Sequence, residues 1–310
     1  MSHDHHHHDH DHHDHGHHHH ASRDFGLAFA FGIGLNFAFV VVEAVYGVLA
    51  HSMALLADAG HNLSDVLALA LAWGASRLVR REPSERYTYG LRSTSILAAL
   101  VNAALLLLVT GGIVWESIQR LAAPEPVASR TVIWVALAGI AVNAASALPF
   151  AKSGGDLNIR AAFLHLAADA AISLGVVLAA LLTLYTGWLW VDPVVGIAIA
   201  LVIIAGTWGL LRDSVTMALD AVPPHIDPAK VRTYLSGLTG VTEVHDLHIW
   251  AMSTTETALT VHLVMPKGHA GDAFTAEVCR ELRAHHHVHH STIQIETGAQ
   301  PCELAPDHVV

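Results

Sequence analysis

Long apolar blocks dominate the first two thirds of the chain and set the architecture that we expect. A helix needs ~20 predominantly apolar residues to cross a bilayer, and short polar connections separate six blocks of about that length. The expected spans are Asp24–Leu49, Ala54–Leu78, Thr94–Ser117, Thr131–Phe150, Asn158–Thr186 and Val191–Arg212. The pattern therefore predicts an α-helical membrane protein with six transmembrane helices joined as hairpins.

After Leu219 the apolar blocks end, and the pattern predicts a small soluble domain. Asp227 as the cap and Pro228 at the first position predict a helix that runs to Leu238. Alternating apolar and polar positions predict strands, and a helical pattern follows the second of them. The expected strands are Val241–Trp250, Thr257–Met265 and Ser291–Glu296, and the second helix is Thr275–His285. This order predicts a small α+β domain, ferredoxin-like and metallochaperone-like, with its helices on one face of the sheet.

These boundaries divide the chain into four regions. We expect a disordered His/Asp-rich tail at residues 1–22, the six-span membrane domain at residues 23–218, the α+β domain at residues 219–300 and a flexible tail at residues 301–310. The composition, 53% hydrophobic and only 14% charged, excludes an ordinary soluble protein of this length. No cleavable signal peptide is expected, because the first apolar block is too long and follows a His/Asp tract.

The basic residues predict the orientation in the membrane. They gather in the connections after the second block (Arg77, Arg80, Arg81, Arg86 and Arg92) and after the fourth (Lys152 and Arg160). The opposite side has only Arg120 and Arg130. Because basic loops stay inside, both termini and the α+β domain are expected in the cytoplasm. There Cys279 and Cys302 stay reduced; Cys302 is a candidate ligand for a soft metal, but an ordinary thiol is the favoured reading.

Two His-x-x-x-Asp pairs at membrane depth are the strongest chemical signal. His61 precedes Asp65 by four residues, and His165 precedes Asp169 by the same spacing. Residues four apart share one face of a helix, so two helices offer two imidazoles and two carboxylates to one point. That set suits tetrahedral Zn²⁺, and ionisable residues inside a membrane are costly enough to indicate function. Asp58, three residues before His61, is a candidate for the shell around these ligands.

This ligand set predicts a transport mechanism. Two carboxylates offset the charge of a dication, and protons are the natural replacement when the metal leaves. We therefore expect metal/proton antiport by alternating access. An alternative remains a membrane-anchored metal sensor or storage protein. An intramembrane protease is disfavoured because no His-Glu-x-x-His motif occurs, and an ATP-driven pump because no phosphate-binding loop occurs. We expect no enzymatic activity, no organic cofactor and no nucleic-acid partner.

The first twenty residues contain thirteen His and four Asp. Such a tract binds divalent transition metals, and its irregular Asp interruptions argue against an artificial tag. We interpret it as a metal-collecting tail, whose first candidate ligands are His5, His6, His7, His8, His10, His12 and His13.

Three segments carry a resemblance to a known family. ALLADAGHNLSDVLALALAW, RYTYGLRSTSILAALVNA and NIRAAFLHLAADAAISLGVVLAA resemble the cation diffusion facilitators, especially bacterial zinc and cobalt-zinc-cadmium efflux transporters. The resemblance implies a homodimeric, proton-driven exporter in the bacterial inner membrane. Its substrate would be Zn²⁺, with Cd²⁺ and Co²⁺ as further candidates, and its transport ligands would be His61, Asp65, His165 and Asp169.

The resemblance also implies features outside the transport site. A regulatory metal site in the α+β domain would use His245, His248, His262 and Glu296. A charge pair between Arg92 and Asp220 would interlock the two protomers. The chain departs from the family in having no His in the loop after the second span and in carrying Ser95 where relatives often have an acid. The cluster HHHVHH at residues 285–290 stays unassigned between metal relay, dimer contact and solvated loop.

Overall fold

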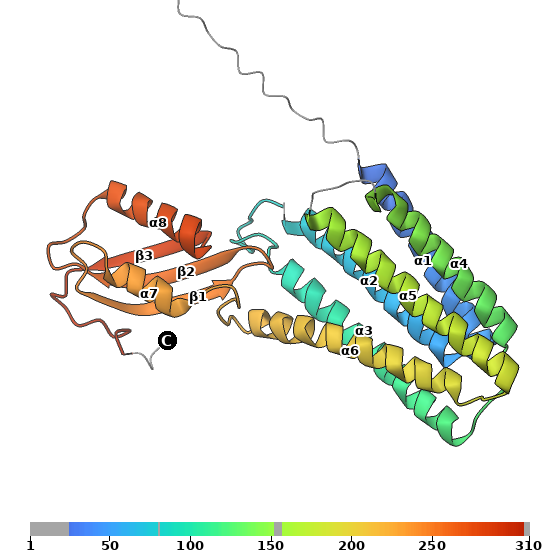
Figure 1. The fold of residues 1–310 in the computed structure, drawn as a ribbon. Helices are drawn as coiled ribbons and strands as arrows, with labels where there is room; N and C mark the ends of the chain where they lie inside the picture. Colours follow the sequence, from blue (N-terminus) through green and yellow to red (C-terminus); the bar gives the residue numbers. More distant parts are fainter. Residues whose placement is uncertain (1–24, 80, 152–156, 307–310) are drawn as a thin grey trace, which may run out of the picture.

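A computed structural model describes residues 25–79, 81–151 and 157–306. Six long helices form one elongated bundle, and a small α+β domain lies at one end of it (Figure 1). The helices are α1 Phe25–Leu49, α2 Met53–Val79, α3 Thr94–Ala122, α4 Ser129–Ala151, α5 Leu157–Thr186 and α6 Val191–Ala218. The fold class expected from the apolar blocks is therefore confirmed.

The apolar surface of the bundle is what a membrane protein requires. Judged by length and composition over the described residues, α3, α4, α5 and α6 qualify as membrane spans, and Gly34–Leu49 in α1 is a shorter apolar helix. The helix α2 is equally long but carries Asp58, His61 and Asp65. Many large apolar side chains face outward, as in Trp115, which is 67% exposed. Exposure of this kind suits lipid rather than water.

The bundle divides into two groups of helices that meet at α2. α1, α2, α4 and α5 pack together, α3 packs along α6, and α2 contacts both α3 and α6 (Figure 1). At the end far from the α+β domain, Asp192 in the first turn of α6 accepts hydrogen bonds from the Ser52 hydroxyl and the Met53 amide, both at 2.5 Å. The Met53 amide is at the first position of α2 and has no acceptor within that helix. Asp192 of α6 therefore caps the first turn of α2.

The α+β domain has the predicted elements. α7 (Pro228–Ser236) begins at Asp227, whose carboxylate accepts from the amides of Ala229 and Lys230. The strands β1 (Glu243–Ala251), β2 (Thr257–Val264) and β3 (His290–Glu296) form a sheet in the order β1-β2-β3; β1 is antiparallel to β2, and β3 is parallel to it. The helix α8 (Asp272–His286) is the crossover between β2 and β3.

Both helices of this domain contribute to one core with the sheet. Val231 and Leu235 of α7, Val278 and Leu282 of α8, and Leu259 of β2 belong to a single buried apolar cluster. A register irregularity interrupts β1 between His245 and His248, where Asp246 has a φ of 49°. This bulge changes the face to which the following side chains point, which matters for the metal site described below.

Candidate metal sites

Three of the four expected membrane ligands converge in the bundle. His61 and Asp65 project from α2 and Asp169 from α5, and each offers a ligand atom within 4.8 Å of the others. His61 Nε2 lies 3.1 Å from Asp169 Oδ1, and the side chain of Asp169 is only 5% exposed. His165 precedes Asp169 by one turn of α5, but its side chain lies outside the part of the chain that the structure describes. Two helices thus bring one imidazole and two carboxylates together.

A small polar cavity borders this group. It has a volume of about 90 Å³ and is lined by Asn36, Asn62, Asp65, Asn143 and Asp169 together with apolar side chains of α1, α2 and α5. One water needs ~10–15 Å³ of such space. The cavity is therefore large enough to hold a water molecule next to the carboxylates of Asp65 and Asp169.

Asp58 lies behind the ligands rather than among them. It is fully buried, and its Oδ2 accepts a hydrogen bond from Ser173 of α5 at 2.7 Å. On the same side, Asn62 donates to Glu43 of α1 at 3.0 Å. The sequence predicted a role for Asp58 near the ligands but did not identify Ser173, which continues the spacing of His165 and Asp169 by four more residues.

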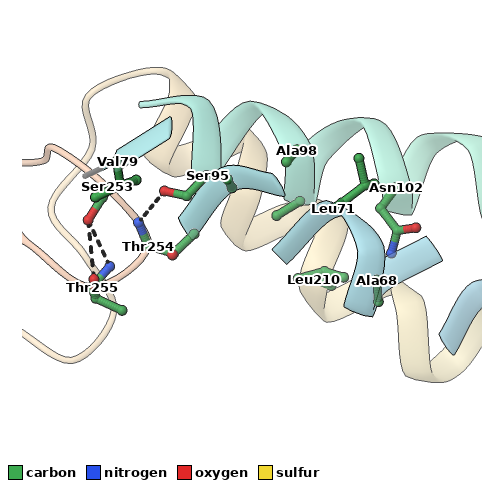
Figure 2. A pocket seen from close by; sticks show the side chains of 12 residues that line it. Ala68, Leu71, Val79, Ser95, Ala98, Asn102, Leu210, Ser253, Thr254 and Thr255 are labelled. Carbon is green, nitrogen blue, oxygen red and sulfur yellow. Dashed lines mark hydrogen bonds between the residues drawn. The ribbon is translucent and has the colours of Figure 1, made fainter. Parts of the chain in front are cut away.

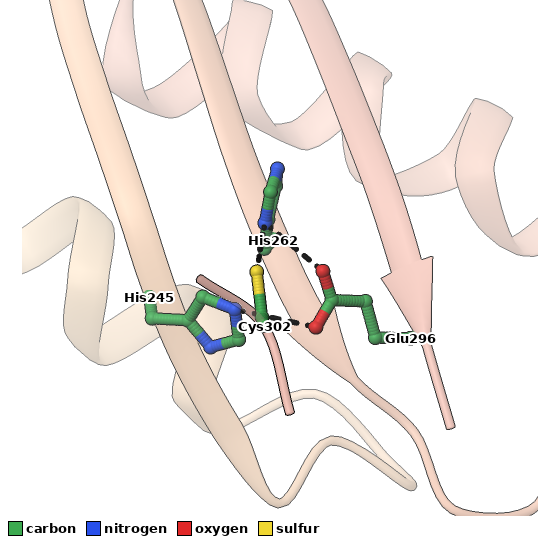
Figure 3. A group of neighbouring side chains, drawn as sticks. All are labelled: His245, His262, Glu296 and Cys302. Carbon is green, nitrogen blue, oxygen red and sulfur yellow. Dashed lines mark hydrogen bonds and ion pairs between the residues drawn. The ribbon is translucent and has the colours of Figure 1, made fainter. Parts of the chain in front are cut away.

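A second cluster lies on the sheet of the α+β domain (Figure 3). His245 of β1, His262 of β2, Glu296 at the end of β3 and Cys302 in the segment after it have ligand atoms within 4.8 Å of one another. The register explains the approach, because His245 is the direct partner of His262. His262 Nδ1 lies 3.0 Å from Glu296 Oε1 and 3.6 Å from the sulfur of Cys302.

The electrostatics of this cluster suit a cation. Both ring nitrogens of His245 are buried without a hydrogen bond among the described residues, and its Nε2 lies 3.3 Å from the carboxylate of Glu296 (Figure 3). Burial raises the pKa of Glu296, but hydrogen bonds from Gln294 and Cys302 and the charges of the two histidines outweigh it and lower the pKa. A hydrogen bond from the Leu304 amide lowers the pKa of the Cys302 thiol, but burial and the Glu296 carboxylate raise it by more. The net pKa of Cys302 is therefore raised. A bound dication would reverse that last effect.

The role of His248 as a ligand stays a prediction. The bulge at Asp246 puts His248 on the same face of the sheet as His245, because His248 pairs with Thr260, two residues before His262; no group of candidate ligands among the described residues includes it. Instead His248 Nε2 lies 2.8 Å from Asp246 Oδ1, while Asp246 Oδ2 lies 3.2 Å from His262 Nε2. Asp246 therefore bridges the two histidines, and Cys302 is the fourth member of the group of candidate ligands. The spacing of His245 and His248 alone could not indicate their shared face, because residues three apart in a regular strand point to opposite faces.

Arg92 has a partner within its own chain. The expected pair with Asp220 would join two protomers and stays a prediction. The guanidinium of Arg92 pairs with Glu256, in the turn between β1 and β2. Next to this pair the amide of Thr254 donates to the hydroxyl of Ser95 at 3.1 Å (Figure 2). The turn and the helices α2, α3 and α6 enclose a cavity of about 430 Å³. Ser95 is thus a contact between the two domains.

The histidines at residues 285–290 point in several directions. His286 packs against Tyr234, with ring centroids 5.2 Å apart, and His287 caps α8 in a left-handed conformation beside His225. His290 meets Tyr89 edge to face. Among the described residues these histidines do not form a group of candidate metal ligands.

The predicted metal-collecting tail lies outside the described residues. Its candidate ligands are His5, His6, His7, His8, His10, His12 and His13.

The rest of the chain resembles known proteins. Residues 30–217 match the model of the cation efflux transmembrane domain, and residues 223–298 match that of the cation efflux protein, cytoplasmic domain. The second of these domain families is named for dimerisation, which supports dimer formation by this chain.

Curated relatives cover nearly the same length. The zinc transporter ZitB of Escherichia coli is 38% identical over 272 residues, covering 87% of this chain and 86% of the relative. The cadmium, cobalt and zinc/H(+)-K(+) antiporter of Bacillus subtilis is 34% identical over 268 residues (84% and 86%), and the metal cation efflux system protein CzcD of Cupriavidus metallidurans is 35% identical over 270 residues (86% and 84%). The chain is a multi-pass membrane protein that belongs to the cation diffusion facilitator family of metal cation efflux transporters.

Proposed function

We propose that the chain exports Zn²⁺ from the cytoplasm in exchange for protons, by alternating access to the site formed by His61, Asp65 and Asp169 with His165. The convergence of His61, Asp65 and Asp169 from two membrane helices is the observation that carries this proposal. Relatives named as zinc transporters and as a cadmium, cobalt and zinc antiporter support the same class of substrate. Cd²⁺ and Co²⁺ are further candidate substrates.

Charge balance explains why protons would take part. With neutral histidines, the carboxylates of Asp65 and Asp169 carry two negative charges, which a divalent cation neutralises. When the cation leaves, the buried carboxylate of Asp169 and the half-buried carboxylate of Asp65 repel each other, and protonation relieves that repulsion. Protons and metal then compete for the same ligands, so a proton gradient directed into the cell drives metal out of it.

The C-terminal cluster is proposed as a regulatory site. His245, His262, Glu296 and Cys302 offer the nitrogen, oxygen and sulfur donors that Zn²⁺ accepts in tetrahedral sites. The turn that follows β1 contacts Ser95 and Arg92 at the start of α3, which gives this site a physical connection to the membrane domain. We propose that metal in the cytoplasm binds here in a homodimer and biases the transport helices.

The topology is part of the proposal. We place both termini and the α+β domain in the cytoplasm of a bacterial cell with the protein in its inner membrane, because the basic connections lie on that side. The His-rich tail would then collect metal on the side from which it is exported. Deleting residues 2–20 should change the apparent affinity for zinc without abolishing transport.

The test is zinc flux into inside-out vesicles, with and without an imposed proton gradient. Zinc uptake should rise several-fold when the vesicle interior is acidic, and Asp169→Ala should abolish that rise. Asp213→Ala removes an exposed carboxylate near the end of α6 and serves as the matched control. Gradient-independent flux, or native flux in Asp169→Ala, would overturn antiport. A metal sensor or storage protein, the alternative from the sequence, would bind zinc and show no flux.

A further inference from the structure

Two carboxyl groups outside the proposed metal ligands are buried together in the membrane domain. Glu43 lies on α1 and Asp58 on α2, and both residues have no exposed surface. The two side chains lie within hydrogen-bond reach of each other. Carboxylic acids are among the residues least often fully buried. Neither Glu43 nor Asp58 is a ligand of the proposed metal site, so their burial needs another explanation.

The donors around this carboxyl pair satisfy only half of its oxygens. Asn62 donates to Glu43 Oε2 at 3.0 Å, and Ser173 donates to Asp58 Oδ2 at 2.7 Å. The other two oxygens, Glu43 Oε1 and Asp58 Oδ1, are buried, and no donor among the described residues reaches either of them. Two acceptor oxygens of neighbouring acids without a donor between them form a stable contact only if one of the acids carries a proton.

Charge leads to the same conclusion. Two ionised carboxylates in contact, both removed from water, repel strongly, and such pairs share a proton. None of the ion pairs found among the described residues joins a Lys or Arg to Glu43 or Asp58. The other ionisable groups that act on the pair are His61 and Asp169, which belong to the proposed transport site. The pair is therefore electrostatically coupled to that site while remaining separate from its ligands.

We propose that Glu43 and Asp58 bind one shared proton, and that a divalent cation at the transport site displaces it. This inference rests on the proposed function. The O–H bond of the shared acid breaks, the proton passes to water, and both groups remain as carboxylates. Asp58 lies one helical turn before His61. The positive charge of a cation bound at His61 is therefore close to Asp58 and favours its ionised state. The pair would thus supply a coupling proton in addition to any proton released by the metal ligands themselves.

The position of the pair also connects the proton to movement of the helices. Glu43 belongs to α1, Asp58 to α2 and Ser173 to α5, so the hydrogen-bonded chain joins three helices of one group. With the proton present, the pair holds α1 against α2. Loss of the proton turns this attraction into repulsion, which favours separation of the two helices when metal is loaded.

The test measures proton release when Zn²⁺ is added to the purified full-length protein in weakly buffered detergent solution. Glu43→Gln should bind Zn²⁺ but release about one proton fewer per bound ion than the native chain. Glu116→Gln, which removes a half-exposed carboxylate of α3, should match the native release. Equal release by Glu43→Gln and the native chain would overturn the shared proton while leaving antiport intact.

A second measurement needs no variant to fold. Infrared difference spectra of the native protein, with Zn²⁺ minus without, should show loss of the carbonyl stretch of a protonated carboxylic acid, and that stretch should shift in D₂O. Its absence in a preparation that shows gradient-driven zinc flux would overturn the inference alone. Absence of both the band and gradient-driven flux would overturn the proposed function as well.

Discussion

Arg92, two residues before α3, donates a hydrogen bond to Glu256 in the turn between β1 and β2. The pair therefore joins the membrane domain to the α+β domain at the point where Ser95 accepts from the Thr254 amide. Its side chains are 35% and 29% exposed, so water screens the interaction. A partly exposed ion pair of this kind is worth ~0.2–1 kcal/mol.

We expect Arg92→Gln and Glu256→Gln to lower the thermal unfolding temperature slightly and non-additively, because each removes the same interaction. A double-mutant cycle should give a coupling energy of ~0.5 kcal/mol. Exchange of the two charges in Arg92→Glu/Glu256→Arg should recover part of the loss. Arg86→Gln, a change in the same connection to a side chain that stacks on Tyr87, is the control. Additive effects in the cycle would show that the pair contributes nothing to domain contact.

Cys302 should be a metal ligand, whereas Cys279 on α8 should not. With Co²⁺ as a spectroscopic substitute for Zn²⁺, the native chain should show a thiolate-to-metal charge-transfer band, because only sulfur ligands produce it. Cys302→Ser should remove the band and weaken binding at the C-terminal site by about tenfold, which is ~1.4 kcal/mol. Cys279→Ser should retain it.

His248→Asn provides a further comparison for this site. Because His248 reaches His262 only through Asp246, its loss should leave the charge-transfer band in place. Loss of the band in His248→Asn, or its survival in Cys302→Ser, would contradict the ligand set in Figure 3.

The fold was largely predictable from the sequence because lipid imposes a simple rule. Apolar blocks long enough to span a bilayer predicted six helices, and the structure places helices at all six. The His-x-x-x-Asp spacing likewise predicted that His61 and Asp65 share one face of a helix, and the structure brings both side chains close to Asp169. Both predictions depend only on distances along a single helix, and these can be counted directly in the sequence.

The features that were missed depend on contacts between elements. The bulge at Asp246 put His248 on the face of His245, and the return of the chain after β3 brought Cys302 to His262. Cys302 follows Glu296 by six residues, and that spacing alone does not predict that the chain turns back toward the sheet. The contact of Arg92 with Glu256 was not predicted for the same reason, since the position of the turn containing Glu256 is a tertiary feature.

His286 should make the stability of the α+β domain depend on pH. Burial against Tyr234 and the neighbouring His285 lower its pKa below 6.5, so the unfolded chain binds more protons than the folded chain near that pH. Stability from this group is therefore present above pH 6.5 and is lost as the pH falls below it. Unfolding midpoints followed from pH 7.5 to 5.5 should fall more steeply for the native chain than for His286→Gln.

The control for this experiment is His51→Gln. His51 lies on the connection between α1 and α2, and its side chain is exposed beside Glu125 of the membrane domain. Replacing it should leave the loss of stability of the α+β domain at low pH unchanged. Equal slopes for the native chain and His286→Gln would contradict the assignment.

Gly196 should be the least replaceable glycine of α6. A Cβ at this position would lie 3.0 Å from the backbone carbon and oxygen of Met53, and a backbone cannot move aside as a flexible side chain can. Gly196→Ala should therefore destabilise the protein by ~1–3 kcal/mol, the usual cost of overpacking. Gly206→Ala, with nothing within 4 Å of its added carbon, should be neutral or stabilising by up to ~1 kcal/mol.

The same substitution should also affect transport, because Gly196 lies one turn after Asp192, which caps the start of α2. Pushing α6 away from Met53 lengthens those hydrogen bonds and releases the helix that carries His61 and Asp65. We expect Gly196→Ala to reduce gradient-driven zinc flux several-fold at equal protein amount, with Gly206→Ala unchanged. Asp192→Asn, which keeps the size of the side chain but removes its charge, should reduce flux in the same direction; full flux in both variants would show that α2 needs no support from α6.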